Sequence, residues 1–306
     1  MPFSAARGGR VCGVFKPVMK IAIVFERVYE HTMGGYFERA LRSLGAQVDH
    51  FWAHSARAIP PQYDLYLRVD DSFLEHRIPE KLQPQILFAS DLHIPHVFSK
   101  VIKQRNQYRM VLTPVRPAVK KLKQLGVPVD WFNIGCEPET HFPVPGPKLY
   151  DIGFVGNDGG SPRKFILEAL LERYPRSFFG HADFRELGRI YSASRIGFNY
   201  AIRDEYFQMR SYEILASRTM LLMHALGDDT LERLGFAEGR DLVTFKSVDE
   251  LFRSVEYYLH HEKEREAIAE SGYQEVIARH TYRHRMRELL DLASARLKIP
   301  SLAAFK

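Results

Sequence analysis

Short runs of apolar residues alternate with longer amphipathic stretches along most of the chain. The run at 20–25, which is apolar after Lys20, is followed by Phe37, Ala40, Leu41 and Leu44, which recur at helical spacing until Gly45. This pattern predicts a buried strand, a loop and a helix. Further strands are predicted at 48–52, 65–69, 86–88, 110–112 and 129–132, with helical stretches such as 115–125 between them. Such alternation is typical of a parallel, doubly wound α/β sheet.

A proline-rich segment interrupts this alternation. Residues 137–148 contain four prolines and one glycine, a composition typical of an inter-domain linker. The α/β pattern then restarts, with strands predicted at 150–155, 177–179, 196–200, 220–223 and 242–245, helices at 162–172, 184–193 and 209–216, and helix from 248 onward. We therefore expect two Rossmann-like domains facing a cleft, 19–136 and 150–280, joined by the linker 137–149. We expect a C-terminal helix in 281–306 to pack back on the first domain, and 1–18 to be a disordered tail ahead of a start at Met19.

Composition excludes several other classes of protein. With 306 residues, 45% hydrophobic and 26% charged, the chain has the size and balance of a globular protein of two domains. No apolar run approaches the roughly 18 residues that span a bilayer. Only Cys12 and Cys136 are present, so we expect no disulfide framework and a cytoplasmic location.

The net charge of +6 is modest for a chain of this length. We expect the basic residues to be spread along the chain, with no dense block of lysine and arginine. A solvated surface explains this charge, as does a diphosphate ligand or a peripheral contact with an anionic membrane. No nucleic-acid-binding module is recognisable, so no nucleic-acid partner is expected.

The loop after the strand at 150–155 is the richest candidate site, because ligands of open α/β sheets bind outside the carboxyl ends of strands. It begins with Gly156 and Asn157, and Ser161 is expected to cap the following helix. Arg163 and Lys164 then lie at the positive end of the helix dipole, which favours a bound anion. The loop therefore predicts a phosphate site that includes Gly156, Asn157 and Arg163. A flexible glycine turn with solvated basic residues explains the same pattern.

A second candidate lies after the strand at 196–200. Glu205 and Glu213 are separated by seven residues, and Arg210 and Glu213 share one face of a predicted helix. A carboxylate in this position could accept two hydrogen bonds from a ribose diol. A surface ion pair between Arg210 and Glu213 is the alternative.

The first half offers weaker candidates. Gly34 and Gly35 open the first helix and would let the backbone approach a ligand. Asp91 and His93 follow the strand at 86–88 and could bind or deprotonate an acceptor hydroxyl, although such a pair is also common in purely structural roles. No cluster has metal-ligand spacing and no Walker, G-x-S-x-G or G-x-G-x-x-G motif occurs, so neither a metal nor a cofactor is expected.

Several of these stretches resemble a known family. Residues 151–157 followed by Arg163, residues 210–217 running on through Leu221, and the helices from Asp249 through Arg279 are similar to the C-terminal domain of spore-maturation-protein-B-like glycosyltransferases. The resemblance covers about 150–290; the first half matches mainly in architecture and in the loop of Asp91 and His93. One departure is the pair Ser217-Arg218, where the family usually has Cys-Gly or a similar small pair.

The resemblance implies a GT-B fold and transfer of a sugar from a UDP-, GDP- or dTDP-sugar to an acceptor. It implies that Glu213 binds the donor ribose, Arg163 and Arg210 the diphosphate, and Glu205 the sugar hydroxyls. Stereochemistry does not carry over, because the Gly-Lys phosphate signature of some retaining relatives is absent.

The expected reaction is metal-independent glycosyl transfer, with helix N-termini and arginines stabilising the leaving nucleotide. An inverting enzyme would need Asp91 or His93 as its base. A nucleotide-sugar epimerase of the same fold, or a non-catalytic assembly or coat protein that keeps the fold, are the alternatives.

Overall fold

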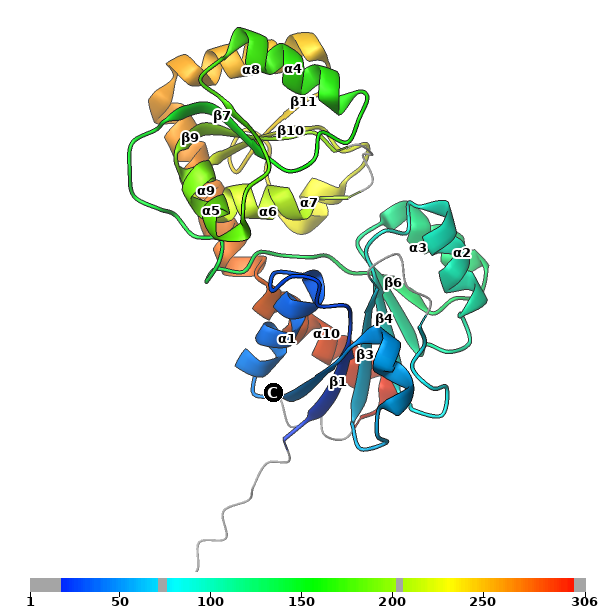
Figure 1. The fold of residues 1–306 in the computed structure, drawn as a ribbon. Coiled ribbons are helices and arrows are strands. Elements are labelled where there is room, and N and C mark those ends of the chain that lie inside the picture. The colour runs from blue at the N-terminus through cyan, green and yellow to red at the C-terminus, as the bar shows by residue number, and fades with distance from the viewer. Residues whose placement is uncertain (1–17, 71–75, 202–205, 300–306) are drawn as a thin grey trace, which may run out of the picture.

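The computed structural model describes residues 18–70, 76–201 and 206–299, which form two parallel α/β units (Figure 1). The first sheet has the strand order β2-β1-β3-β4-β5-β6 and the second has β11-β10-β9-β7-β8. The strands of the first sheet are β1 (Lys20–Val24), β2 (Gln47–Phe51), β3 (Leu65–Asp70), β4 (Gln85–Ala89), β5 (Met110–Thr113) and β6 (Val129–Trp131). Those of the second are β7 (Tyr150–Val155), β8 (Phe178–Gly180), β9 (Ser194–Asn199), β10 (Met220–His224) and β11 (Val243–Phe245).

Helices connect most of the successive strands, because parallel neighbours need crossover connections. The first unit contains α1 (Met33–Ser43), the 3-10 helix η1 (Ala53–Ala58), α2 (Pro95–Lys103) and α3 (Arg116–Gln124). The second contains α4 (Arg163–Arg173), α5 (Phe184–Ser192), α6 (Met209–Ala216), α7 (Thr230–Leu234), α8 (Val248–His260) and α9 (Glu262–Arg279), and α10 (Tyr282–Leu297) follows. The α/β class predicted from the sequence is confirmed, and each predicted strand lies within two residues of an observed one. None of the helices in the described ranges combines the length and apolar character needed to cross a bilayer.

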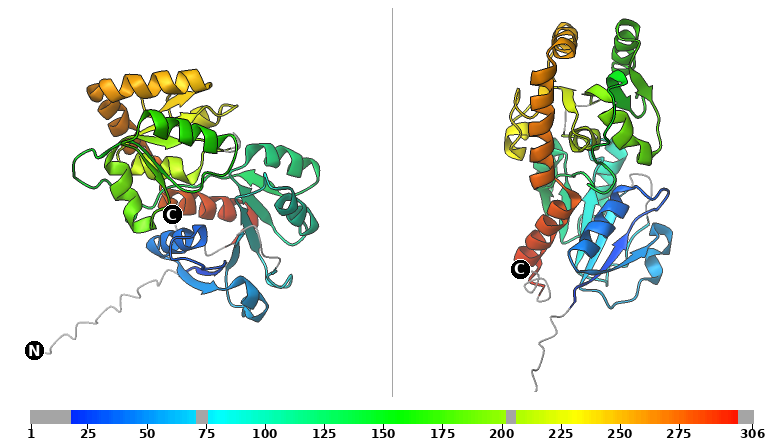
Figure 2. Two further views of the ribbon diagram at one scale, coloured as in Figure 1. Left: turned by 45° about the horizontal axis from the view of Figure 1, so that its top comes forward. Right: turned by 90° about the vertical axis from the view of Figure 1, so that its left-hand side faces the viewer.

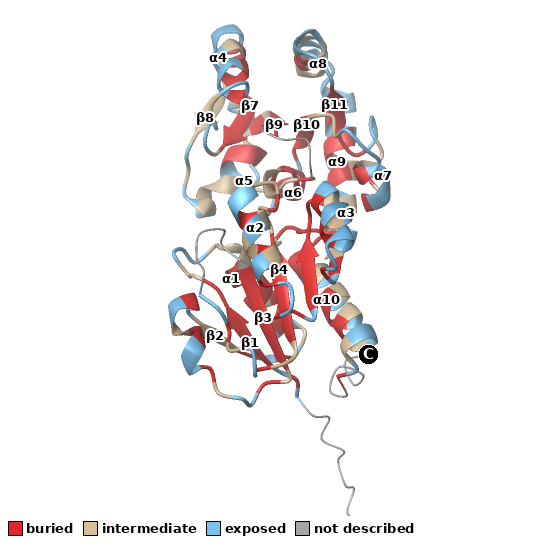
Figure 3. Cartoon of the chain, turned by 90° about the vertical axis from the view of Figure 1, so that its right-hand side faces the viewer, coloured by how far each residue is buried: buried red, intermediate tan, exposed pale blue. Residues whose placement is uncertain are grey.

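The central strands are apolar on both faces because helices cover both sides of each sheet. These central strands are accordingly buried in both units, whereas the edge strand β8 is half-buried (Figure 3). On β1, Ile21 and Ile23 belong to the cluster shared with α1 and α10, whereas Ala22 and Val24 face the cluster formed with η1. Burial of such side chains contributes about 1.5–3 kcal/mol each. These two-sided cores explain why most of the central strands appear in the sequence as largely apolar runs, although β3 also carries the buried Arg68.

The start of α4 differs from the expectation. Arg163 is its first residue and Pro162 occupies the N-cap position, with no side-chain cap. The prediction that Ser161 caps this helix is wrong, because Ser161 lies one residue before the N-cap. Gly160 instead accepts a hydrogen bond at its carbonyl from the Lys164 N–H, at 2.9 Å.

The chain crosses between the two units twice, side by side. Cys136 leaves the first unit, and its N–H donates to the His280 carbonyl at 2.9 Å while its carbonyl accepts from the Tyr282 N–H at 2.8 Å. After this point α10 packs against α1 of the first unit (Figure 2). The boundaries of the predicted domains remain predictions.

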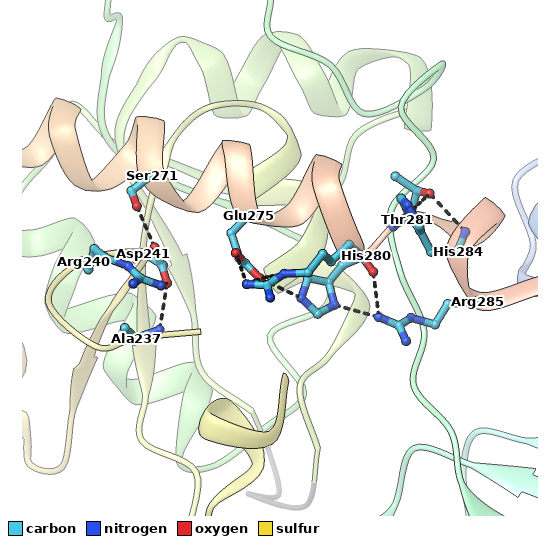
Figure 4. A network of polar contacts seen from close by, with 10 residues as sticks. Ala237, Arg240, Asp241, Ser271, Glu275, His280, Thr281, His284 and Arg285 are labelled. Carbon is cyan, nitrogen blue, oxygen red and sulfur yellow. Dashed lines mark hydrogen bonds and ion pairs between the residues drawn. The ribbon is translucent and has the colours of Figure 1, made fainter. Parts of the chain in front are cut away.

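A polar network fixes the second crossing (Figure 4). The His280 Nδ1 accepts from Arg285 Nη2 at 2.7 Å, and Arg285 Nη2 also donates to the Arg279 carbonyl at 3.1 Å. Burial and Arg285 lower the pKa of His280 to about 3, so this ring is neutral in ordinary buffers and accepts the bond. Thr281 and His284 then form a capping box at the start of α10.

Both sheets share one topological feature that positions a ligand. In each, the first strand lies between the second and the third, so the direction of the crossovers reverses between β1 and β3 and again between β7 and β9. Ligands of doubly wound sheets bind outside the carboxyl ends of strands at such a switch point. The loops after β7 and β9 are therefore the expected site in the second unit.

Candidate functional site

Arg210 is the centre of the contacts at the switch point of the second sheet. Its Nε donates to the Val155 carbonyl at the end of β7 at 2.7 Å, and its Nη1 donates to Asn199 Oδ1 at the end of β9 at 3.0 Å. The guanidinium also lies over the Phe154 ring, 4.2 Å from its centroid. Asn199 is held in turn, because its amide donates to Ser211 Oγ at 2.8 Å. A cation is thereby fixed where parallel strands β7 and β9 end.

Gly156 allows this arginine to come close. Its φ of +135° is rarely adopted by other residues. A Cβ atom at this position would overlap Nη2 of Arg210, so both the backbone conformation and the available space require glycine. The Gly156 N–H donates to the Gly180 carbonyl at 2.8 Å, which ties the loop to the end of β8.

Arg163 is buried and bonded to the backbone of the loop that carries Gly156. Its Nη2 donates to the Asn157 carbonyl at 2.7 Å, its Nε to the Asp158 carbonyl at 2.8 Å and its Nη1 to the Tyr200 carbonyl at 3.2 Å. Burial and the nearby Arg210 lower the pKa of Arg163 to about 10. Arg163 therefore shapes the loop from behind, while the Asn157 side chain stays exposed.

Glu213 lies one turn after Arg210 on α6 and is only 7% exposed. No ion pair joins Glu213 to Arg210 within the described residues, and Glu213 is not on the surface, so the predicted alternative of a surface ion pair is wrong. Burial raises the pKa of Glu213 to about 7, against the opposing effect of Arg210. The site therefore contains a carboxyl group that titrates near neutral pH.

A residue of the linker contacts Glu213. The Nε2 of His141 is 3.8 Å from Glu213 Oε1 and 3.3 Å from the Tyr36 hydroxyl on α1. Burial lowers the pKa of His141 to about 3, so the ring is neutral. Its Nδ1 accepts from the Glu137 N–H at 3.2 Å, which leaves the proton on Nε2. This imidazole connects the carboxyl group of the second unit with the first unit.

Gly34 and Gly35 open α1, as predicted, and are buried. A Cβ on Gly34 would overlap the Phe25 ring, and one on Gly35 would lie 2.8 Å from the Glu30 carbonyl oxygen. Close packing within the first unit thus accounts for both glycines. Binding of a ligand by their backbone remains a prediction.

The other first-unit candidates lie between β4 and α2. The His93 ring is 6.3 Å from the ring of Tyr206, which precedes α6 in the second unit. Within the described chain, His93 Nδ1 is buried and has no hydrogen-bond partner. Asp91 is on the same loop, and its carbonyl accepts from the Ile94 N–H at 2.9 Å. Glu205 lies outside the described residues.

The structure thus brings Gly156, Asn157, Arg163 and Arg210 together, with Glu213 one helical turn away. Sequence reasoning missed Asn199, Phe154 and His141. The sequence pattern could have indicated Asn199, since it is a polar residue at the end of a predicted strand. No pattern in the sequence indicates His141, because its partners come from distant parts of the chain.

A pocket of about 350 Å³ lies beside this cluster. Gly156, Asn157 and Lys164 line one side, and Phe179 and His181 at the end of β8 line another. This is within the size range of small-molecule sites. No group of three or more potential metal ligands occurs in the described ranges.

Comparisons with known proteins agree with this architecture. A sequence profile described as "Glycosyl transferase-like" matches residues 138–291. A search of curated proteins by sequence gave no match. Among solved structures, Anabaena HepE in complex with UDP-glucose has a TM-score of 0.64 at 10% identity, covering 90% of this chain and all of that chain. The DNA modifying enzyme beta-glucosyltransferase has a TM-score of 0.61 at 14% identity, covering 92% and 100%. A glycosyltransferase from Rickettsia africae has a TM-score of 0.61 at 12% identity, covering 92% and 99%.

The two parallel α/β sheets and their likeness to these structures define a GT-B fold. The profile spans about half of the chain. The protein therefore belongs to the glycosyl transferase-like family, and it is an enzyme of the glycosyltransferase class.

Proposed function

We propose that this enzyme transfers a sugar from a UDP-sugar to an acceptor hydroxyl, and that the donor binds at the switch point of the second sheet. The observation that carries the proposal is the fixed guanidinium of Arg210 against Gly156, with Glu213 one turn away. A cation held by β7 and β9 suits the diphosphate, and a carboxyl group beside it suits the ribose diol. The similar structures of HepE and the DNA modifying enzyme were solved with UDP-glucose, which supports uridine as the base.

The residues divide into those that contact the donor and those that position the contacts. We assign Arg210 to the diphosphate and Glu213 to the ribose. Arg163 holds the loop of Gly156 and Asn157 through its three backbone bonds. Charge that develops on the leaving UDP as the glycosidic bond breaks would be stabilised by Arg210, already oriented in the free enzyme. No metal is required for this role, and Glu205 stays the candidate for the sugar hydroxyls.

Two finer assignments rest on the sequence. We place the chain with the spore-maturation-protein-B-like enzymes on the stretch from Arg210 to Ser217. We place it in the cytoplasm because two cysteines are too few for a disulfide framework and Cys136 is a free thiol.

UDP is expected to stabilise the folded protein, because only the native fold assembles the loops after β7 and β9. At a concentration of 100 Kd the gain is about 2.7 kcal/mol, which corresponds to a rise in Tm of roughly 5 °C. A thermal-shift panel of UDP, GDP and dTDP measures this gain and ranks the bases. Absence of any shift at millimolar concentration would contradict the donor site.

Replacement of the catalytic base is expected to separate turnover from donor binding. If the enzyme inverts, His93→Ala or Asp91→Asn should lower acceptor-dependent release of UDP by roughly 100-fold or more while the Kd for UDP stays near wild type. The separation arises because these residues lie in the first unit and the donor groups in the second. Near-normal turnover in both variants, or a parallel loss of UDP binding, would contradict the base assignment. UDP release that requires no acceptor would contradict transfer itself.

A further inference from the structure

The charge of this chain is concentrated in one segment of the first unit. Residues 92–129 contain eight lysines and arginines and no aspartate or glutamate. The chain as a whole carries +6, so the remainder sums to a slightly negative charge. The earlier interpretation that basic residues are spread along the chain without a dense block is therefore wrong for this segment.

The fold gathers this charge on one side of the first sheet. Helices α2 and α3 are consecutive crossovers between the neighbouring strands β4, β5 and β6, and right-handed crossovers place both on the same face. They share one apolar cluster and lie next to each other (Figures 1 and 3). We call their outer surface, with the loops at their ends, the α2–α3 face.

Most of the cations on this face are unpaired. Arg116 forms ion pairs with Asp228 and Asp229 of the second unit. Six others are exposed, and none of them forms an ion pair with any residue of the described chain: Lys103, Arg105, Arg109, Lys120, Lys121 and Lys123. A solvated surface normally mixes charges of both signs. A face with such an excess of positive charge attracts a polyanion, with an attraction that salt screens.

Apolar groups accompany these cations. A pocket of about 340 Å³ opens between the two helices, lined by Phe98, Val115 and Pro117, with Lys121 also in its lining. Leu125 at the C-cap of α3 is 48% exposed. Cations interleaved with apolar groups match a lipid surface, where phosphate groups lie above hydrocarbon. A nucleic-acid duplex offers phosphates on its outside but no apolar layer, so it would leave the pocket and Leu125 unused.

We propose that the α2–α3 face docks on an anionic lipid bilayer. The basic side chains contact lipid phosphates, and the apolar pocket lies toward the acyl boundary. Because His93 also lines this pocket, docking would bring the loop of Asp91 and His93 close to acceptors at the membrane. The docking surface is separate from the donor site and does not depend on the identity of the donor.

The test uses the full chain and vesicles of phosphatidylcholine alone or with about 30% phosphatidylglycerol. The wild type is expected to sediment with the anionic vesicles at least 10-fold more strongly than with the neutral ones, and to be released as NaCl is raised from 50 to 500 mM. The variant Lys120→Gln/Lys121→Gln/Lys123→Gln is expected to bind anionic vesicles about 100-fold less strongly, since each basic residue near such a surface contributes roughly a factor of 5.

A matched variant removes the same charge elsewhere. Lys246→Gln/Arg253→Gln/Lys263→Gln takes three exposed cations from the second unit and is expected to bind anionic vesicles within about twofold of wild type. Unchanged UDP stabilisation in both triple variants would show that the fold and donor site are intact. Equal binding to neutral and anionic vesicles, equal losses in the two triple variants, or tighter binding to duplex DNA than to vesicles at the same phosphate concentration would overturn the proposal.

Discussion

Arg210→Met is expected to weaken UDP binding on the order of 100-fold, and Arg210→Lys on the order of 10-fold. A charged hydrogen bond to a diphosphate contributes about 1.5–3 kcal/mol. Methionine removes the charge, whereas lysine keeps it but cannot reproduce the fork that bonds to Val155 and Asn199 together. Titration calorimetry of the three proteins measures the effect.

Stability has to be separated from binding here, because Arg210 also connects β7 to β9. Thermal unfolding followed by circular dichroism gives the Tm of each variant. The UDP titrations are then made well below the lowest of these Tm values. Arg173→Met is a matched control: it removes an exposed arginine from the far end of α4, where it pairs with Glu256. Equal UDP affinity in wild type and Arg210→Met would place the diphosphate elsewhere.

The sequence was sufficient to predict the strands and the double α/β pattern. Strands buried on both faces have to be largely apolar, as in β4, where every residue is buried and Ile86 to Ala89 are all apolar. Chain order then restricts the topology, since parallel neighbours need crossover helices. Helix boundaries follow less directly from the sequence, because a helix start depends on local backbone geometry, as the N-cap of α4 at Pro162 shows.

Side-chain partners could not be predicted in the same way. Arg163 was expected to face an anion because it begins a helix. In the structure its three nitrogens bond to carbonyls of the preceding loop and of Tyr200. His141 contacts a residue 105 positions away, and nothing in the linker marks it for that contact. Such contacts depend on how two separately folded units meet, which local patterns do not encode.

The α2–α3 face could be predicted from the sequence in part: more than the side-chain partners, but less than the strands. The absence of acidic residues from 92–129 is a property of the sequence, but its placement on one face follows only from the adjacency of β4, β5 and β6. Arg116 shows the difference between composition and structure. It belongs to the same basic segment, yet the fold pairs it with Asp228 and Asp229 and removes it from the free surface.

Glu213→Gln is expected to stabilise the free enzyme at pH 8 and to weaken UDP binding. The carboxyl group has a pKa of about 7 in the folded protein, against 4.5 ordinarily. Its contribution to stability is therefore fully present below pH 4.5, is lost as pH rises to 7 and stays lost above. The loss is up to about 3 kcal/mol. Glutamine has nearly the same shape and no charge, so urea denaturation should show the variant more stable at pH 8, with the difference shrinking toward pH 5.

UDP binding should change in the opposite direction. An ionised carboxylate accepts both ribose hydroxyls, so wild-type affinity is expected to rise up to 10-fold between pH 6 and pH 8, whereas Glu213→Gln binds roughly 10-fold more weakly at pH 8. Any pH effect from the nucleotide itself appears equally in the variant and cancels in the ratio of the two Kd values. Glu172→Gln, an exposed position on α4, controls for the loss of one negative charge. A variant that is less stable at pH 8 would mean that Arg210 stabilises the ionised Glu213 by more than burial costs, and an unchanged Kd would remove Glu213 from the ribose site.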